Sequence, residues 1–264
     1  MTELDFYDVF QGQVAAFLLV LVRSSGIFFI SPFLGSQNLS VRFRAGTAIV
    51  FAVLLFPVVV SESVIHAPAN LLMFAATVAK ELFIGWLIGL VGYLTLTAVN
   101  TAGKIMDMQV GFAVVNMMDP TTQQQTGLIG TFLYNLTIIF FVITNGHHVI
   151  ISALAESFRI IPLDSMVWND SLPQFMIDLT AGIWVNGMKI AMPVTFAILL
   201  TNVGMGVLAR TMPQMNIFVV GIPMHLTIGI CTVAMILPFY LLFLDVMFNE
   251  IYANISIALK SLSP

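Results

Sequence analysis

The sequence has very little charge. Only 8% of its 264 residues are Asp, Glu, Lys or Arg, whereas soluble domains carry about 25%. Apolar residues make up 59% of the chain, and the mean hydropathy is +1.01. This composition excludes an ordinary soluble domain and predicts a membrane protein with several spans.

Cysteine and positive charge are also scarce. Cys231 is the only cysteine, so no disulfide can form within the chain. The nine Lys and Arg residues are dispersed and form no basic stripe, so we expect no nucleic-acid partner. Residues 1–12 contain acidic but no basic residues, the opposite of the start of a signal peptide, and no cleaved signal peptide is expected.

Motifs of catalysis are missing as well. The sequence has no P-loop, no Gly-x-Ser-x-Gly elbow and no cysteine cluster. His147 and His148 are consecutive, so they cannot ligate one metal ion from a single helix face. We therefore expect no catalytic residues, no metal, no cofactor and no enzymatic activity.

Six apolar segments follow one another, at 13–31, 45–60, 71–99, 128–144, 181–208 and 218–244. As helices the second and fourth would be about 24–26 Å long, and the third, fifth and sixth would exceed about 40 Å. A bilayer's hydrocarbon core is about 30 Å thick. The sequence thus predicts an all-α integral membrane protein of about six long, partly broken helices in hairpins. The short segment 147–161, which contains two charged residues, is predicted to be interfacial or re-entrant.

The loops differ in charge. Arg42 and Arg44, Lys104, and Arg210 follow the first, third and fifth segments, and the opposite loops are mainly acidic. The positive-inside rule then predicts an external N-terminus and cytoplasmic loops after these three segments.

Four of the Asp, Glu, Lys and Arg residues fall within apolar segments: Arg23, Lys80, Glu81 and Lys189. Such groups are costly in a bilayer and usually face protein or water. One interpretation is that Glu81 pairs with another helix while Lys80 reaches an interface; the other is that Glu81 lines a proton-responsive path. Arg23 has the same two alternatives, with an ion pair inside the chain or between subunits favoured. Pro193 predicts a kink near Lys189.

The third loop is unusually apolar. After Lys104 it runs through 110–118, which could cover only about 14 Å as a helix, and closes at Asp119 and Pro120. Irregular backbone at membrane depth has to be buried in protein or face a cavity. One interpretation is a deformable, methionine-rich seal inside a conduit; the alternative is a loop packed statically against helices. The candidate residues are Met106, Met108, Gly111, Phe112, Val114, Asn116, Met117 and Met118.

A polar turn separates the fifth and sixth segments. A basic residue precedes two prolines within this turn, and each proline lacks a backbone donor, so we expect a helix to break at both. The turn residues are Arg210, Pro213, Gln214, Asn216, Gly221 and Pro223.

This turn resembles the late signature of the FliR/SctT family of flagellar and virulence type III export-gate proteins, and other matches occur in family-like order along nearly the whole chain. They are Arg23-Ser-Ser-Gly26, Ser31-Pro32-Phe33, Arg44, Pro57, Lys80-Glu81, Gly85, Gly89, Gly103, Asp107, Gln109, Gly111, Asp119-Pro120, Gln123–Gln125, Asn145-Gly146-His147, Ser157-Phe158, Pro162 and Pro213–Pro223.

The resemblance implies a subunit of a helical, hetero-oligomeric export gate in the bacterial inner membrane, at the flagellar basal body. It implies FliP and FliQ as partners, contact with FlhB, FlhA and membrane lipids, and passage of unfolded export substrates. Residues 1–180 would be FliP-like and residues 181–264 a FliQ-like hairpin within one unit. Residues 106–122 would be a plug, and Arg23, Lys80, Glu81, Lys189 and Arg210 would make subunit contacts. The alternative is a small secondary transporter with its site at the broken fifth and sixth segments.

Overall fold

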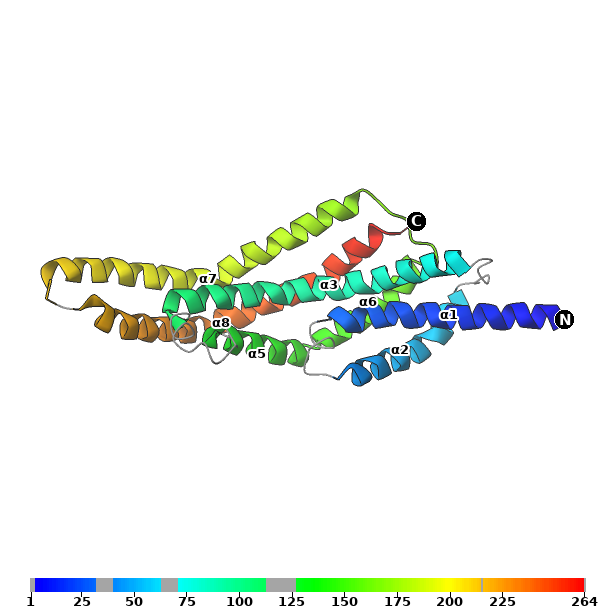
Figure 1. Ribbon diagram of the computed structural model, residues 1–264, viewed down its shortest axis with the longest axis horizontal. Helices are drawn as coiled ribbons and strands as arrows, with labels where there is room; N and C mark the ends of the chain where they lie inside the picture. Colours follow the sequence, from blue (N-terminus) through cyan, green and yellow to red (C-terminus); the bar gives the residue numbers. More distant parts are fainter. Residues whose placement is uncertain (1–2, 32–39, 63–70, 113–126, 215, 264) are drawn as a thin grey trace. The chain divides into compact units, whose positions relative to one another are not determined.

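The computed structural model describes residues 3–31, 40–62, 71–112, 127–214 and 216–263, and in these residues it contains helices and no strand. The predicted all-α fold is confirmed. The helices are α1 (Glu3–Ile30), α2 (Val41–Glu62), α3 (Leu71–Val110), α5 (Leu128–Ile143), α6 (Gly146–Ile160), α7 (Ser171–Thr211) and α8 (Ile217–Lys260) (Figure 1).

Five of these helices are long and apolar enough to cross a membrane. The shorter α5 and α6 reach that length only as a pair joined across a break, which would make a sixth. At this break Asn145 adopts a left-handed backbone conformation with φ of 58°, which Asn tolerates better than most residues. The count of about six apolar segments agrees with the structure, and the membrane topology predicted from the loop charges stays a prediction.

Four helices extend well beyond the apolar segments that the sequence predicts, and the first of them, α1, begins ten residues early, at Glu3. α3 continues from residue 99 to Val110, α7 begins ten residues earlier at Ser171, and α8 continues past Asp245 to Lys260. Charged and polar residues such as Glu, Lys and Gln form helices almost as well as Leu does. Hydropathy therefore located the apolar part of each helix and not its ends.

Between the fifth and sixth apolar segments the helix breaks at only one of the two expected prolines. α7 ends at Thr211 and Pro213 lies in the break, as predicted, but Pro223 lies inside α8. The predicted second break is wrong. A proline inside a helix costs about 3 kcal/mol, and packing of the helix can offset this cost. Gly221 is buried here, and a Cβ atom at this position would lie 2.6 Å from the Met205 methyl group of α7.

The described helices divide into two compact units. The first contains residues 1–94, 145–178 and 249–264, and the second contains residues 95–144 and 179–248. Neither unit is a continuous stretch of sequence. The predicted division into a FliP-like part (1–180) and a FliQ-like hairpin (181–264) concerns likeness to other proteins and stays a prediction.

The first unit is built on the α1–α2 hairpin and the close approach of α3 to α1. Phe28 and Phe51 pack with ring centroids 5.4 Å apart between α1 and α2, which lie side by side in Figure 1. A Cβ atom on Gly26 would lie 2.8 Å from the Leu82 carbonyl oxygen, and a Cβ atom on Gly85 would overlap the Arg23 carbonyl oxygen. Gly89, one turn after Gly85, approaches the Ile27 carbonyl oxygen in the same way, at 3.1 Å from an added Cβ atom. Two small residues four positions apart thus let α3 pack closely against α1.

The second unit packs the end of α3 against α5, α7 and α8. Gly187 of α7 approaches α3 so closely that a Cβ atom would lie 3.0 Å from the Ala98 carbonyl oxygen. The Tyr240 hydroxyl of α8 is buried against α5, 2.5 Å from Thr137 Oγ1 and 3.2 Å from the Leu133 carbonyl oxygen. Phe141 meets Phe248 edge-on at 5.2 Å.

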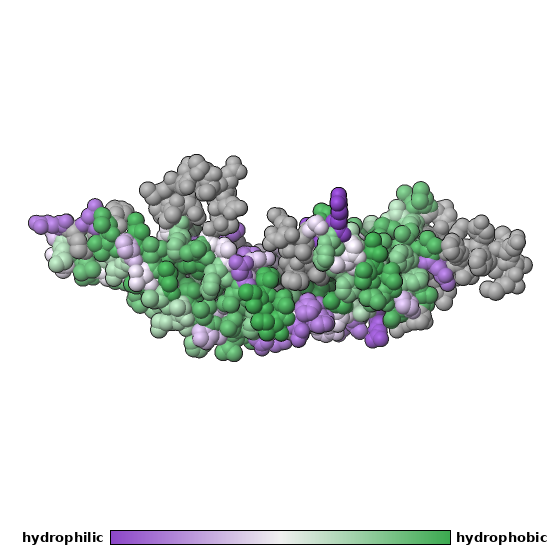
Figure 2. Space-filling view, turned by 90° about the horizontal axis from the view of Figure 1, so that it is seen from below, coloured by the Kyte–Doolittle hydropathy of each residue, from purple (hydrophilic) through white to green (hydrophobic). Residues whose placement is uncertain are grey.

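Large apolar side chains also cover the outside of both units. Phe239 and Met235 are 72% and 76% exposed, and Leu54 of α2 is 62% exposed. Figure 2 shows apolar residues over much of the visible face, with hydrophilic residues scattered between them. An apolar exterior of this kind indicates that lipid, or other protein chains, surrounds the helices.

Candidate functional site

The last two turns of α3 lead into the predicted plug. Met106 and Val110 are fully buried, whereas Met108 is 71% exposed. The helix continues through this stretch to Val110, so the prediction that the loop opens at Lys104 is wrong; no proline interrupts it, and the backbone turns only at Gly111, with φ of 97°. Phe112 is half-buried. Val114, Asn116, Met117 and Met118 of the predicted plug lie outside the described residues.

Asp107 of α3 caps the start of α5. Its Oδ1 accepts a hydrogen bond from the Ile129 backbone N–H and its Oδ2 accepts one from the Gly130 N–H, both at 2.9 Å. The first turn of a helix has N–H groups without acceptors inside the helix. The residue at the N-cap position of α5 is Gly127, which has no side chain to supply an acceptor. A carboxylate from another helix does so, and it also complements the positive end of the helix dipole.

Small residues make room for this cap. A Cβ atom on Gly127 would overlap the Asp107 carboxylate, and a Cβ atom on Gly103 would overlap the Cα atom of Gly130. Asp107 is only 5% exposed. Because the Asp107 carboxylate joins the end of α3 to the start of α5, residues 111 and 127 lie close together, and these are the two ends of the connecting segment.

α8 also contacts this junction. A Cβ atom on Gly229 would fall within the Val110 side chain, so α8 passes directly over the last turn of α3. Val110 is thereby fully buried against α8, and the 111–127 connection starts from this closely packed junction.

A second buried cluster lies in the other unit, around Arg23 and Glu81. Arg23 Nε donates to Glu81 Oε2 at 2.5 Å, and the two residues are 0% and 1% exposed. Arg23 Nη1 donates to the carbonyl oxygens of Ser157 and Ile161, at 2.9 and 3.0 Å. The Phe158 ring centroid lies 4.2 Å from the guanidinium carbon. The cation therefore satisfies the carbonyl end of α6 as well as its carboxylate partner.

Glu81 uses its second oxygen in the same network. Its Oε1 accepts a hydrogen bond from the Asp164 N–H at 3.2 Å. Asp164, with φ of 64°, accepts from Thr77 Oγ1 at 2.8 Å and lies 3.7 Å from the Lys80 ammonium, which is 43% exposed. Glu81 pairs with another helix, which agrees with the first of the two interpretations of the sequence.

The remaining predicted charges and turn residues lie at the surface of the second unit. Lys189 is exposed on α7, and Arg210 is exposed in its last turn. Pro213, Gln214 and Asn216 are exposed between α7 and α8, where the Asn216 carbonyl oxygen accepts from the N–H groups of Val219 and Val220. Their predicted subunit contacts stay a prediction.

Sequence reasoning named Asp107 only as a matching position and gave it no role. Ser157, Asp164 and Tyr240, which complete the buried networks, had none either. One feature of the sequence could have drawn attention to Asp107: it is an acidic residue among apolar ones, four positions after Gly103. Its acceptor role depends on where α5 begins, which only the fold decides. Among the described residues no group of three or more His, Cys, Asp or Glu is placed to hold a metal ion.

The fold and these two clusters define a class, a helical membrane protein whose buried ionisable groups connect helices to one another. Comparison with known proteins gives the family. The sequence profile of the bacterial export proteins, family 1, matches residues 14–251. The chain therefore belongs to this family, which includes the flagellar FliR proteins.

Several characterised relatives cover most of the chain. It is 31% identical to flagellar biosynthetic protein FliR of Bacillus subtilis over 217 residues, which is 81% of this chain and 83% of the relative. It is 29% identical to FliR of Pectobacterium carotovorum over 254 residues, or 95% of each chain. It is 28% identical to Yop proteins translocation protein T of Yersinia pestis over 229 residues, which is 84% of this chain and 85% of the relative.

Proposed function

We propose that this protein is a non-enzymatic subunit of a bacterial type III export apparatus of the flagellar kind. The observation that carries the proposal is the family match over residues 14–251. The relatives are named for flagellar biosynthesis and for translocation of Yop proteins. In this proposal the chain lies in the inner membrane and forms, together with FliP and FliQ, the pore for unfolded flagellar subunits. FlhA and FlhB are further contacts.

The exterior of the chain supports an assembled state. Phe196, Leu199 and Val203 of α7 are each more than half exposed, and they recur at the spacing of one helix face. A helix face of this kind needs lipid or a neighbouring helix against it. In the gate, we place subunits such as FliP and FliQ on these faces.

The base of the 111–127 connection supports a plug. Asp107 and the buried Val110 hold the two ends of the connection together. A seal has to be displaced by a passing chain and has to return, so its ends have to stay fixed while its middle moves. In this proposal residues 106–122 close the pore, with the part up to Val110 as the fixed base.

The test is native mass spectrometry of the tagged chain, expressed with and without FliP and FliQ from the same genome. We expect a discrete heteromeric complex, and a marked loss of recovered chain when the partners are omitted. A monomer or homo-oligomer whose recovery is indifferent to the partners would contradict the proposal and favour the small secondary transporter.

A further inference from the structure

A groove runs along the hairpin of α1 and α2 in the first unit. It has a volume of about 270 Å³. Its walls are mainly apolar, and they include Phe28 and Phe29 of α1 and Val41, Ala45 and Ile49 of α2. Phe29 and Val41 are both more than half exposed, so the groove opens to the surroundings of the chain.

Among the described residues that line this groove, the polar ones are Ser25 and Arg44. Ser25 Oγ donates a hydrogen bond to the Val22 carbonyl oxygen at 2.8 Å, so its proton is used within α1. Arg44 is half-buried in the first turn of α2. A guanidinium has five N–H donors, so Arg44 can meet an anion in addition to its contacts within the chain. A ligand of this groove therefore needs an apolar body and one anionic group.

α2 has the length of a single membrane span, and Arg44 lies near one end of it. Its 22 residues cover about 33 Å as a helix, close to the roughly 30 Å of the hydrocarbon core. Between Arg44 and Glu62 the sequence has no Asp, Glu, Lys or Arg. Only 17% of the apolar span is buried within the chain. The charged ends of α2 then fall at the depth of the lipid headgroups, and the apolar walls of the groove lie among the acyl chains.

We propose that this groove binds an anionic phospholipid, with its phosphate on Arg44 and an acyl chain against Phe28, Ala45 and Ile49. Arginine pairs with phosphate through two parallel hydrogen bonds. The positive-inside rule predicts that this end of α2 faces the cytoplasm, where basic pockets between helices attract anionic headgroups. The proposal rests on the proposed function only for the location in the inner membrane, and it requires no partner subunit.

A single acyl chain fits the groove better than a helix of a partner subunit does. An α-helix with its side chains is about 10 Å wide, so a stretch as long as residues 41–49 fills about 900 Å³. The groove holds about 270 Å³, so such a helix would lie over it and only a few of its side chains would enter. A hydrocarbon chain is one methylene wide and can lie within the groove along its whole length.

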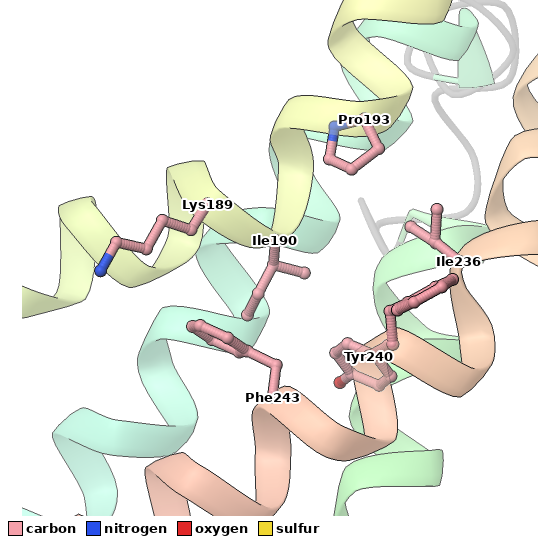
Figure 3. A pocket seen from close by; sticks show the side chains of 7 residues that line it. Lys189, Ile190, Pro193, Ile236, Tyr240 and Phe243 are labelled. Atoms are coloured by element: carbon pink, nitrogen blue, oxygen red, sulfur yellow. The ribbon is translucent and has the colours of Figure 1, made fainter.

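The groove between α7 and α8 provides a comparison. It has a similar volume, about 240 Å³, and also one cation, Lys189. Figure 3 shows the Lys189 side chain extending away from Tyr240 of the facing helix. Exposed apolar side chains flank Lys189 on both sides along α7, from Ile177 before it to Val203 after it. This cation does not lie at the end of an apolar span, so we expect no preference for anionic phospholipid there.

The first experiment identifies the occupant of the α1–α2 groove. A photo-crosslinking amino acid replaces Ala45, an exposed residue of the lining, in the full chain co-expressed with FliP and FliQ. We expect mass spectrometry to find a phospholipid adduct. An adduct with a FliP or FliQ peptide, or the absence of a lipid adduct, would overturn the proposal.

The second experiment tests the anion. The purified complex is placed in phosphatidylcholine vesicles with a small share of phosphatidylglycerol that carries a photoreactive group in an acyl chain. The readout is the share of the chain's label that falls on the α1 peptide 21–29. We expect Arg44→Gln to lower this share roughly fivefold and Arg44→Lys to retain most of it. Ala45→Leu, which narrows the groove without changing its charge, should also lower it.

Arg42→Gln is the matched control. Arg42 lies in the same turn of α2 but is exposed and does not line the groove, because residues two positions apart on a helix do not share a face. This variant should leave the labelled share unchanged. An equal fall for Arg42→Gln and Arg44→Gln would show attraction by general surface charge and overturn the site. Equal displacement of the label by unlabelled phosphatidylcholine and phosphatidylglycerol would overturn it too.

The outcomes separate this proposal from the proposed function. If the chain forms no complex with FliP and FliQ, the gate assignment fails, and labelling of the chain alone in the same vesicles still decides the lipid site. If the complex forms and Arg44→Gln is labelled like the unmodified chain, the gate assignment stands and the lipid site alone is overturned.

Discussion

Asp107 and Glu81 are buried carboxylates that are satisfied in two different ways. Glu81 meets a cation, Arg23, and one backbone N–H. Asp107 meets only two backbone N–H groups at the start of a helix. An unpaired buried charge costs several kcal/mol, on the order of 3–5 for one partner of a broken pair. Each residue therefore governs the stability of its own unit.

Replacing Asp107 should loosen the start of α5. Asp107→Ala leaves the N–H groups of Ile129 and Gly130 without an acceptor, at a cost of about 1–3 kcal/mol for each buried group. Asp107→Asn retains one acceptor and should cost less. The measurement is hydrogen exchange of peptides covering 127–133 in the purified complex, where exchange should become faster. Asp245→Asn, at an exposed position of α8, should leave the exchange rate of these peptides unchanged.

The Arg23–Glu81 pair should show strong coupling. Arg23→Met and Glu81→Leu alone should each destabilise the protein by about 3–5 kcal/mol, because each leaves a buried charge unpaired. The double variant should lose much less than the sum of the two. A double-mutant cycle on the apparent unfolding temperature measures this coupling, and additive losses would contradict it. Assembly or export should weaken in parallel in both single variants.

At the scale of the helices, close approach depends on glycine. α1 meets α3 at Gly26 and Gly85, and α3 meets α5 at Gly103 and Gly130. These contacts bring backbone against backbone, so no side chain can move aside to admit an added methyl group. Each pair therefore also sets how near the buried ionisable groups of neighbouring helices can come.

The variant Gly85→Ala should destabilise the first unit by about 1–3 kcal/mol, since the added Cβ would overlap the Arg23 carbonyl oxygen. Gly46→Ala in α2 is the matched control, because nothing lies within 4 Å of its added Cβ. This control should stabilise the helix by up to about 1 kcal/mol. Thermal unfolding of both variants in one detergent makes the comparison, and equal shifts would contradict the close-approach argument.

At the scale of the whole molecule, the proposed seal can be tested without disturbing its base. Residues 113–118 can be deleted while Asp107, Val110 and Gly111 remain. In cells that also produce FliP and FliQ, we expect this deletion to let ions leak and to collapse the membrane potential. Deletion of six residues from the connection 64–69 is the control. An unchanged membrane potential with an intact complex would count against the seal.

The charged residues show where prediction from the sequence stopped. The apolar pattern placed Arg23, Lys80 and Glu81 inside helices and left two interpretations of Glu81 open, one of them a pairing with another helix. The partners lie 58 residues apart for Arg23 and Glu81 and 134 residues apart for Arg23 and Ser157. No local pattern specifies contacts over such separations. The start of α1 and the ends of α3, α7 and α8 were missed because hydropathy marks an environment rather than a hydrogen-bonding pattern.

The sequence by itself determined the class of this protein, because a chain with 8% charged residues and long apolar segments must satisfy its backbone within helices in a membrane. Its motifs, in order along the chain, were enough to indicate the family. Only the tertiary structure decided that Asp107 caps α5, that Arg23 closes the end of α6, and that Pro223 stays within a helix. These outcomes depend on which helices lie against one another, and packing between distant segments settles that, not the residues next to each one in the chain.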